Sequence, residues 1–482
     1  MRKIPIKQIL VYIVMTLAVI IVVTIITLFM LGYRFNIGKG NLEQYAILQI
    51  NSSPSGATVS FNGIEYSLKT PTKKSVPAGK YDVAMWRDGY ETWRKSVDIK
   101  SGTMIWLKYA LLVPKKLTVE SVASYESLYS SLASPKGDFM LIEKQSNLPV
   151  FNLVDLSSNT IKQSTMTIPA TLYSEPTTIG VVHTFNIIKW DEGGRYALIN
   201  HLYNDKNEWI VLDTQNVNLS KNITRAFDLP ISAINFSGTS GNIFYSLDSN
   251  DIRRLDLAAG TISAPLISNV VSFDVYNDSK VITYVGNSSA DANKKVVGIY
   301  IEGDEKPSVI RTVDGQINNL HIATTRYFNA NYIAISEGKK VDILSGSYPN
   351  TTNGNTNNMK TVASFESAND IENLSFSPTG EYVFLQSGSY FASYDLEYQN
   401  FASSSIEGNG PVALLNWLDD YYIWSDRDGK LTIREFDGAN VYFINNVLSG
   451  QDVTLTTNGR YLYSLNKTDA KYQLQRVRMI LP

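Results

Sequence analysis

Residues 376–385 read FSPTGEYVFL, a turn followed by an apolar run. Ser, Pro and Gly set the turn, and the aromatic and β-branched residues after it favour a strand. The same pattern recurs at residues 134–142 and, in looser versions, at residues 191–199, 240–245, 277–284, 328–335, 419–424 and 457–463. The pattern therefore predicts a fold built from repeated β units.

A further strand candidate follows each copy of this pattern. These candidates lie at residues 150–155, 209–213, 252–256, 296–301, 340–344, 391–395, 431–436 and 472–477. The eight units average about 46 residues, which is the length of a propeller blade. We therefore expect residues 114–482 to form an eight-bladed β-propeller, with seven blades of about 53 residues as the alternative.

The two ends of this region support eight blades. The last unit stops after its third strand, whereas residues 116–122 form an additional strand candidate before the first unit. We expect residues 116–122 to become the outer strand of the last blade, because such closure removes exposed sheet edges.

The Ser-Pro-x-Gly turn is sharpest at Ser134–Gly137 and Ser377–Gly380. It resembles the WD-like β repeats of the periplasmic propeller in the Tol–Pal system and of related bacterial surface propellers. The Gly-His and Trp-Asp pairs of eukaryotic WD repeats are missing. Residues 425–429 approach the Asp-box of sialidases but place the Asp one position late and have no Trp where it is required.

Residues 9–31 contain no charged side chain and are long enough to cross a bilayer as a helix. We expect a transmembrane helix at 9–31, a cytoplasmic tail at 1–8 and a linker at 32–44. The alternative is a cleaved signal peptide, but the bulky residues 29–33 do not provide a small-x-small cleavage site.

The basic residues near this segment predict its orientation. Arg2, Lys3 and Lys7 precede it, whereas Arg34, Lys39 and Glu43 follow it. Because basic residues are retained on the cytoplasmic side, we expect the N-terminus inside and the rest of the chain outside the cytoplasm.

Residues 45–113 contain a series of strands and turns. Strand candidates lie at 46–50, 58–61, 81–86 and 93–99, and Asn62-Gly63 is a strong hairpin signal. The series resembles the PEGA domain, a small bacterial surface β-sandwich, although Ser55 replaces the Glu of its Pro-Glu-Gly-Ala turn. The resemblance implies an extracytoplasmic module without catalytic residues; a generic small sandwich is the alternative. The matching residues are Pro54, Gly56, Ala57, Gly63, Thr70, Pro71, Pro77, Gly79, Tyr81, Val83, Gly89, Tyr90 and Gly102.

The composition excludes several classes of function. The net charge of −2 provides no basic surface of the kind that binds nucleic acid. The chain has no cysteine, which excludes disulfides, thiolate catalysis and cysteine-ligated zinc. The overall expectation is an all-β protein with one N-terminal transmembrane helix, a PEGA-like sandwich and a propeller.

No catalytic motif is present. His183, His201 and His321 fall in different repeat units and form no His-Glu-x-x-His pattern, and there is no Gly-x-Ser-x-Gly elbow or Walker loop. We therefore assign no catalytic, cofactor-binding or metal-ligating residue, expect no cofactor, and predict that the chain is not an enzyme.

Other polar and aromatic residues have weaker functional interpretations. The acidic turns lack the oxygen ligands of a calcium loop and are interpreted as hairpin tips: Asp248 and Asp251, and Asp419, Asp420, Asp426 and Asp428. Residues 350–358 are interpreted as a surface loop. Trp86, Trp93 and Trp106 are interpreted as core residues, with a glycan-binding platform as the alternative; Trp190, Trp209, Trp417 and Trp424 are expected to pack between blades.

Two functions remain. The first is a membrane-anchored extracytoplasmic scaffold whose propeller binds a protein or a cell-wall glycan. We expect no nucleic-acid partner. The alternative is a propeller-based polysaccharide hydrolase or lyase, which requires two carboxylates about 5–10 Å apart at the channel mouth.

Overall fold

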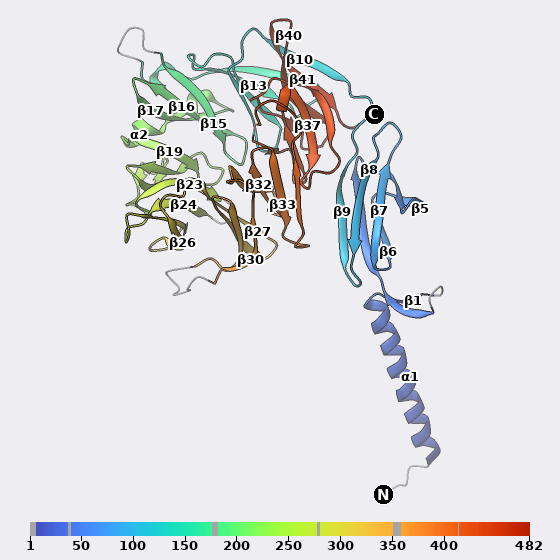
Figure 1. The fold of residues 1–482 in the computed structure, drawn as a ribbon. Coiled ribbons are helices and arrows are strands. Elements are labelled where there is room, and N and C mark those ends of the chain that lie inside the picture. The colour runs from blue at the N-terminus through green and yellow to red at the C-terminus, as the bar shows by residue number, and fades with distance from the viewer. Residues whose placement is uncertain (1–5, 37–39, 176–181, 277–279, 350–357, 413) are drawn as a thin grey trace. The chain divides into compact units, whose positions relative to one another are not determined.

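The computed structural model describes residues 6–36, 40–175, 182–276, 280–349, 358–412 and 414–482 (Figure 1). The chain forms two compact units, which are described separately. Unit 1 comprises residues 1–117 and 479–482, and unit 2 comprises residues 118–478.

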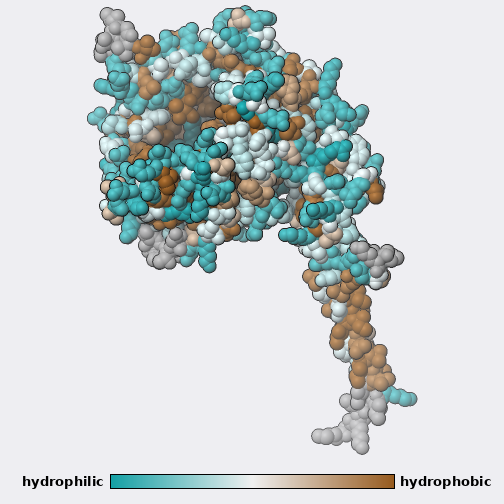
Figure 2. All heavy atoms as spheres, viewed as in Figure 1, coloured by the Kyte–Doolittle hydropathy of each residue, from teal (hydrophilic) through white to brown (hydrophobic). Residues whose placement is uncertain are grey.

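Unit 1 begins with helix α1 (Ile6–Met30). Its segment Leu10–Met30 is apolar and long enough to cross a membrane, and none of that window is buried inside the protein. Figure 2 shows it as an almost uniformly hydrophobic rod. The hydroxyls of Thr16, Thr24 and Thr27 each donate to the carbonyl four residues earlier, at 2.8 Å. The hydroxyls of these three threonines are thus satisfied within the helix, as lipid requires.

A two-stranded hairpin of β1 (Tyr33–Asn36) and β2 (Asn41–Gln44) joins the helix to a β-sandwich. The strand β3 (Ala46–Ser53) alternates buried and exposed side chains, so one of its faces lies in the core. The fully buried Trp93 belongs to this core, as we expected, whereas Trp86 and Trp106 are half-buried. The sandwich has two sheets: β6 (Thr72–Val76), β3 and β9 (Met104–Leu111) in one, and β5 (Ile64–Lys69), β4 (Thr58–Phe61), β7 (Gly79–Trp86) and β8 (Trp93–Ile99) in the other.

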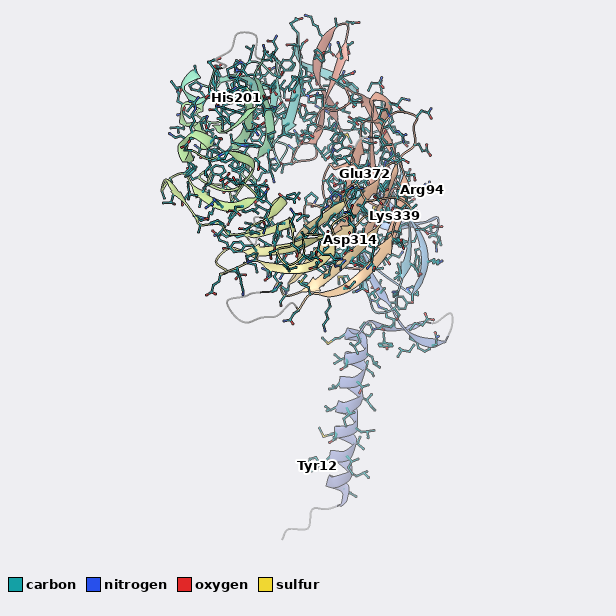
Figure 3. The ribbon with its side chains drawn as sticks, turned by 60° about the vertical axis from the view of Figure 1, so that its left-hand side comes forward. Tyr12, Arg94, His201, Asp314, Lys339 and Glu372 are labelled. Carbon is teal, nitrogen blue, oxygen red and sulfur yellow. The ribbon has the colours of Figure 1, made fainter. Side chains whose placement is uncertain are left out.

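Unit 2 contains eight four-stranded antiparallel sheets among its described residues, so the expectation of an eight-bladed propeller is confirmed. Figure 3 shows these sheets set around a central axis. Blades 1 to 4 are, in chain order, β11 (Ser130–Ala133), β12 (Phe139–Glu143), β13 (Val150–Asp155), β14 (Lys162–Thr167); β15 (Thr184–Trp190), β16 (Tyr196–Tyr203), β17 (Lys206–Asp213), β18 (Lys221–Asn222); β19 (Ile231–Phe236), β20 (Ile243–Asp248), β21 (Asp251–Asp256), β22 (Thr261–Ile262); and β23 (Val270–Tyr276), β24 (Val281–Asn287), β25 (Lys294–Ile301), β26 (Ser308–Asp314).

The remaining blades follow the same order, and a short helix α2 (Ile223–Phe227) follows β18 in blade 2. Blades 5 to 8 are β27 (Leu320–Tyr327), β28 (Ala330–Glu337), β29 (Lys340–Gly346), β30 (Lys360–Glu366); β31 (Asn373–Phe376), β32 (Tyr382–Ser387), β33 (Tyr390–Asp395), β34 (Phe401–Ser405); β35 (Asn416–Trp417), β36 (Tyr422–Ser425), β37 (Lys430–Glu435), β38 (Tyr442–Asn446); and β39 (Thr454–Leu455), β40 (Tyr461–Thr468), β41 (Lys471–Arg478), β10 (Val119–Tyr125).

Blade 8 combines strands from both ends of unit 2. The strand β10 pairs with β41, from Val119 opposite Val477 to Tyr125 opposite Tyr472. The predicted closure is therefore confirmed, although β10 begins three residues later than we expected from the sequence. The pairing covers the edge of β41, the last strand of the chain, which would otherwise be exposed.

The repeated turn has one recurring hydrogen bond. The side-chain oxygens of Ser134, Ser377 and Thr456 each accept the backbone N–H five residues later, at 3.0–3.1 Å. Asp191 Oδ1 accepts the equivalent N–H of Tyr196 at 2.6 Å. The turn therefore requires a short oxygen-bearing side chain rather than serine itself. This explains why the copies of the repeat share their spacing but differ in residue type.

Two of the four tryptophans that were expected to pack between blades each bond to a neighbouring blade. Trp190 of blade 2 is buried and donates from Nε1 to the carbonyl of Leu132 in blade 1 at 3.2 Å. Trp209 is also buried and donates to the carbonyl of Ile231 in blade 3 at 3.0 Å. Each indole thus joins two blades by both packing and a hydrogen bond.

Candidate functional site

The inner wall of the propeller is formed by the first strand of each blade. First strands of neighbouring blades contact one another around the ring, as β11 does β15 and β27 does β31, so this edge faces the axis. Figure 2 shows unit 2 hollowed between its blades. The first candidate site is therefore the wall of this channel.

Three polar side chains meet on that wall from three blades. Lys189 Nζ lies 2.9 Å from Asn235 Oδ1 and 3.3 Å from Asp274 Oδ1. Lys189 follows a bulge in β15, which turns both Ile188 and Lys189 toward solvent. The side chains of Lys189 and Asp274 are 46% and 69% exposed, so a ligand in the channel can reach both charges.

A two-carboxylate mechanism finds little support on this wall. Among the eight described first strands, Asp274 is the only residue with a carboxylate. The pair 5–10 Å apart that a hydrolase requires is therefore not formed between these strands.

The histidines are arranged differently from our expectation. His183 and His201 lie in one blade rather than in separate units, and His201 Nε2 is 3.3 Å from His183 Nδ1. The reason is the antiparallel pairing of β15 and β16, in which Thr184 lies opposite Leu202 and Phe185 lies opposite His201. This register brings His183, the residue before β15, close to His201. His321 is distant in sequence and lies 3.2 Å from the carbonyl of Ile371 through Nε2.

His201, which is labelled in Figure 3, is fully buried in blade 2. Its ring is stacked between the rings of Phe185 and Tyr203. Its Nδ1 is 2.9 Å from Glu208 Oε2. When Nδ1 donates to this carboxylate, Nε2 is left to accept from His183. A chain of polar contacts thus runs from buried Glu208 to half-buried His183.

Glu208 is paired on both oxygens. Ser174 donates from its backbone and hydroxyl at 2.9 Å each, and Arg225 Nε donates at 2.9 Å. Burial alone would raise the pKa of Glu208, but the hydrogen bonds from His201, Ser174 and Arg225 outweigh it and lower the pKa to about 2. The ionised carboxylate of Glu208 therefore holds His201, Ser174 and Arg225 together, and we interpret this cluster as stabilising blade 2.

The acidic turns use their carboxylates on the backbone. Asp419 Oδ1 accepts the N–H groups of Tyr421 and Tyr422, and Asp426 Oδ2 accepts that of Gly450. Within the described part of the chain, no group of three His, Asp or Glu side chains is spaced to hold a metal ion. Most of the predicted loop at 350–358, namely residues 350–357, lies outside the described residues.

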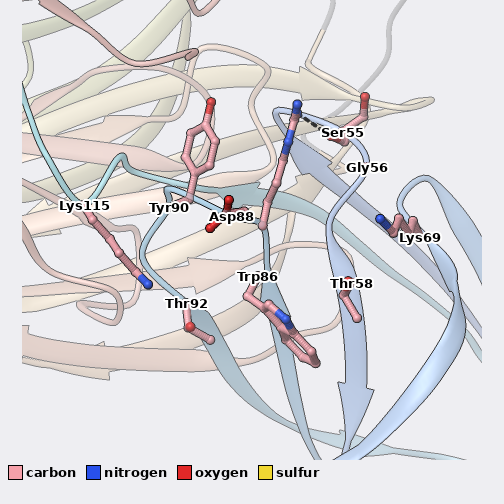
Figure 4. Close-up of a pocket in the computed structure, with 10 residues that line it drawn as sticks. Ser55, Gly56, Thr58, Lys69, Trp86, Asp88, Tyr90, Thr92 and Lys115 are labelled. Atoms are coloured by element: carbon pink, nitrogen blue, oxygen red, sulfur yellow. Dashed lines mark hydrogen bonds between the residues drawn. The ribbon is translucent and has the colours of Figure 1, made fainter. Parts of the chain in front are cut away.

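The second candidate site is a cavity of about 840 Å³ in the sandwich of unit 1. Figure 4 shows Trp86, Lys69 and Lys115 among the residues around it. Its charged members are Lys69, Arg87, Asp88 and Lys115. We expected a core role for Trp86 from the sequence, whereas the structure places it on the wall of this cavity.

Comparison with known proteins identifies part of the chain. Residues 45–113 match the PEGA domain family, which agrees with the resemblance expected from the sequence. None of the curated proteins matches the chain.

Solved structures of similar fold include propellers of distant sequence. The β-propeller domain of Cps50 (Swd1) from Myceliophteria thermophila shows 10% identity and a TM-score of 0.39, covering 76% of this chain and 100% of that one. An oligogalacturonate lyase solved with manganese shows 12% identity, a TM-score of 0.41, and coverage of 70% and 97%. The dihydro-heme d1 dehydrogenase NirN shows 11% identity, a TM-score of 0.43, and coverage of 66% and 67%.

The prediction that the chain is not an enzyme is contradicted by this comparison. It depended on missing motifs, yet the proteins of similar fold include a lyase and a dehydrogenase. At this level of identity the similarity concerns the fold alone and assigns no reaction to this chain.

Proposed function

We propose that this chain is a membrane-anchored extracytoplasmic protein that presents a β-propeller for binding a protein or a cell-wall component. The observation that carries the proposal is the direct attachment of an apolar helix to a PEGA sandwich. Tyr45 donates its N–H to Gly32 at 3.0 Å, and Gln44 Nε2 donates to Leu31 at 2.9 Å. The end of the helix and the start of the sandwich therefore form one continuous structure.

The orientation is inferred from charge. The basic residues Arg2, Lys3 and Lys7 precede the helix, and the segment just after it is closer to neutral. This asymmetry favours retention of the N-terminus in the cytoplasm. The sandwich and propeller would then be exported together.

The proposed contact surface is the part of the channel wall where Lys189 and Asp274 offer opposite charges beside the exposed Ile188. An apolar side chain with charged groups at its rim matches the anatomy of protein-binding sites, in which an apolar core is surrounded by a polar rim. The net charge of −2 gives no general attraction to polyanions that would override such local recognition.

The test is photo-crosslinking in intact cells from full-length protein carrying a crosslinking residue at Ile188. The matched control carries it at Ile262, which is similarly exposed but lies on the outermost strand of blade 3. We expect a discrete envelope component to be captured at 188 and not at 262, and the capture to weaken in the Asp274→Ala background. Equal capture at both positions, or capture of cytosolic proteins alone, would contradict the proposal.

A further inference from the structure

The cavity in the sandwich is built by the register of three strands. Thr58 of β4 pairs with Lys69 of β5 on one side and with Trp86 of β7 on the other. Directly paired residues of neighbouring strands lie on the same face of a sheet, so Lys69, Thr58 and Trp86 form a row. Figure 4 shows these three side chains together at one side of the cavity.

This row lies on the face opposite the core. Val59 and Met85, the neighbours of Thr58 and Trp86 along their strands, are fully buried in the core. Because side chains alternate across a strand, Trp86 points away from that core. A half-buried indole in this position keeps part of its surface free for a ligand.

Three cations surround the cavity: Lys69, Arg87 and Lys115, all exposed. None of them takes part in an ion pair among the described residues. Arg87 is positioned by a hydrogen bond from Nη1 to the carbonyl of Ser55 at 2.9 Å, drawn as the dashed line in Figure 4. Asp88 is the single acidic residue of the lining, so the cavity carries an excess of positive charge.

We propose that this cavity binds an anionic polysaccharide. The apolar face of a sugar ring would lie against Trp86, and the carboxylate or phosphate groups of the polymer would pair with Lys69, Arg87 and Lys115. Guanidinium and ammonium groups recognise such oxyanions by charge-assisted hydrogen bonds. A protein ligand is less suited, because three separated cations around one indole match a repeating small anionic unit.

A lipid headgroup carries the same chemistry but is separated from the cavity by the sandwich. The strand β3 starts next to the end of the helix. Tyr45, which precedes β3, donates its N–H to the carbonyl of Gly32, and Ser101 Oγ donates to the carbonyl of Gln44. From there β3 extends over eight residues, which is about 25 Å, before the turn at Ser55. The cavity therefore opens far from the end of the helix.

The test uses purified full-length protein in detergent and three polymers: alginate as a carboxylate polymer, a phosphomannan as a phosphate polymer, and dextran as a neutral control. We expect binding to at least one anionic polymer and none to dextran. Lys69→Gln with Lys115→Gln should weaken binding on the order of tenfold, and binding should also fall as salt is added.

The matched control is Lys80→Gln with Lys100→Gln, which makes the same change in charge on exposed residues outside the cavity. We expect this pair to stay within about twofold of the wild type. Trp86→Ala should weaken binding on the order of tenfold, and Trp86→Phe should restore most of it because an aromatic face is retained.

Equal losses in both lysine pairs, or equal binding of dextran, would overturn the inference. The inference depends on the proposed function in one respect only: an extracytoplasmic location is what would bring the cavity into contact with such a polymer. Since binding is measured on isolated protein, its failure would leave the proposed location standing, and a wrong location would leave the binding result unchanged.

Discussion

The backbone N–H of Leu481 donates to the hydroxyl of Tyr90 at 2.7 Å, across 391 residues of chain. Leu481 also packs on the sandwich core, and a Cβ on Gly89 would lie 2.9 Å from its Cδ1. The last residues of the chain are therefore part of the sandwich of unit 1 and not of the propeller. The propeller is an insertion between residues 117 and 479 of that unit.

Removing residues 479–482 should destabilise the sandwich. The deletion removes the fully buried Met479 and the packing of Leu481, which together should cost about 3 kcal/mol or more in the free energy of unfolding. Tyr90→Phe, which removes only the hydroxyl acceptor, should cost about 1 kcal/mol. Urea unfolding of the full chain, followed by limited proteolysis of the sandwich, measures both effects.

Tyr66→Phe is the control for Tyr90→Phe, because the Tyr66 ring packs on the same core but its hydroxyl has no hydrogen-bond partner among the described residues. We expect this variant to unfold like the wild type. If Tyr66→Phe and Tyr90→Phe lose the same stability, the bond between Leu481 and Tyr90 contributes nothing.

Gly137→Ala should disrupt the contact between blades 1 and 8. The glycine has a φ of +66°, and an added Cβ would overlap the carbonyl oxygen of Leu455 in β39. Gly260 has a similar φ of +64° but no atom within 4 Å of an added Cβ. Gly260→Ala should cost about 1 kcal/mol for its backbone alone, and Gly137→Ala about 2 kcal/mol more. Equal midpoints in chemical unfolding would contradict this packing.

Glu208→Gln should reduce the stability of the propeller at neutral pH. The folded state lowers the pKa of Glu208 to about 2, so ionisation of this carboxylate stabilises the fold above its unfolded pKa of 4.5. The gain is roughly 3 kcal/mol at pH 7 and is lost as the pH falls from 4.5 toward 2. The gap in unfolding free energy between wild type and variant should therefore narrow over that range, and a gap that is constant with pH would argue against the assignment.

Glu143→Gln should have the opposite effect. Glu143 is fully buried in blade 1, and burial raises its pKa to about 7, although the hydrogen bond from Ser130 acts against this. Ionisation therefore costs stability as the pH rises from 4.5 to 7. We expect the variant to be more stable than the wild type at pH 8, by up to roughly 3 kcal/mol, and to differ little at pH 4. Denaturant titrations at the two pH values test this.

The spacing of turns and strands was sufficient to predict the propeller because each blade repeats one local pattern. The copies at Asp191 and Ser377 differ in residue type, but in both a side-chain oxygen accepts the backbone N–H five residues later. Three strands of the sandwich were not predicted. The strand β6 is short and polar, and β9 pairs with β3 in parallel, so no hairpin turn marks it in the sequence. The strand β5 was missed although its apolar and polar residues alternate.

Trp86 was one of three tryptophans named in the alternative of a glycan-binding platform, but the full candidate sites could not be predicted because they depend on register between segments. Lys189 and Asp274 are distant in sequence and meet only when blades 2, 3 and 4 are arranged side by side around the channel. The row of Lys69, Thr58 and Trp86 requires knowing which residue faces which across two pairs of strands. His183 and His201 were separated in our interpretation because a repeat boundary was placed between them, whereas strand pairing unites them.

The most direct test of the account is the side of the membrane on which unit 1 and the propeller lie. The chain has no cysteine, so a single introduced thiol reports without background. Two variants are needed. One carries Lys80→Cys, at an exposed position of the sandwich, and the other carries a cysteine inserted after Met1. Spheroplasts with each variant would be treated with a membrane-impermeant maleimide. We predict labelling of the sandwich thiol before lysis and of the N-terminal thiol only after lysis. Labelling in the reverse order would contradict an extracytoplasmic propeller on a membrane anchor.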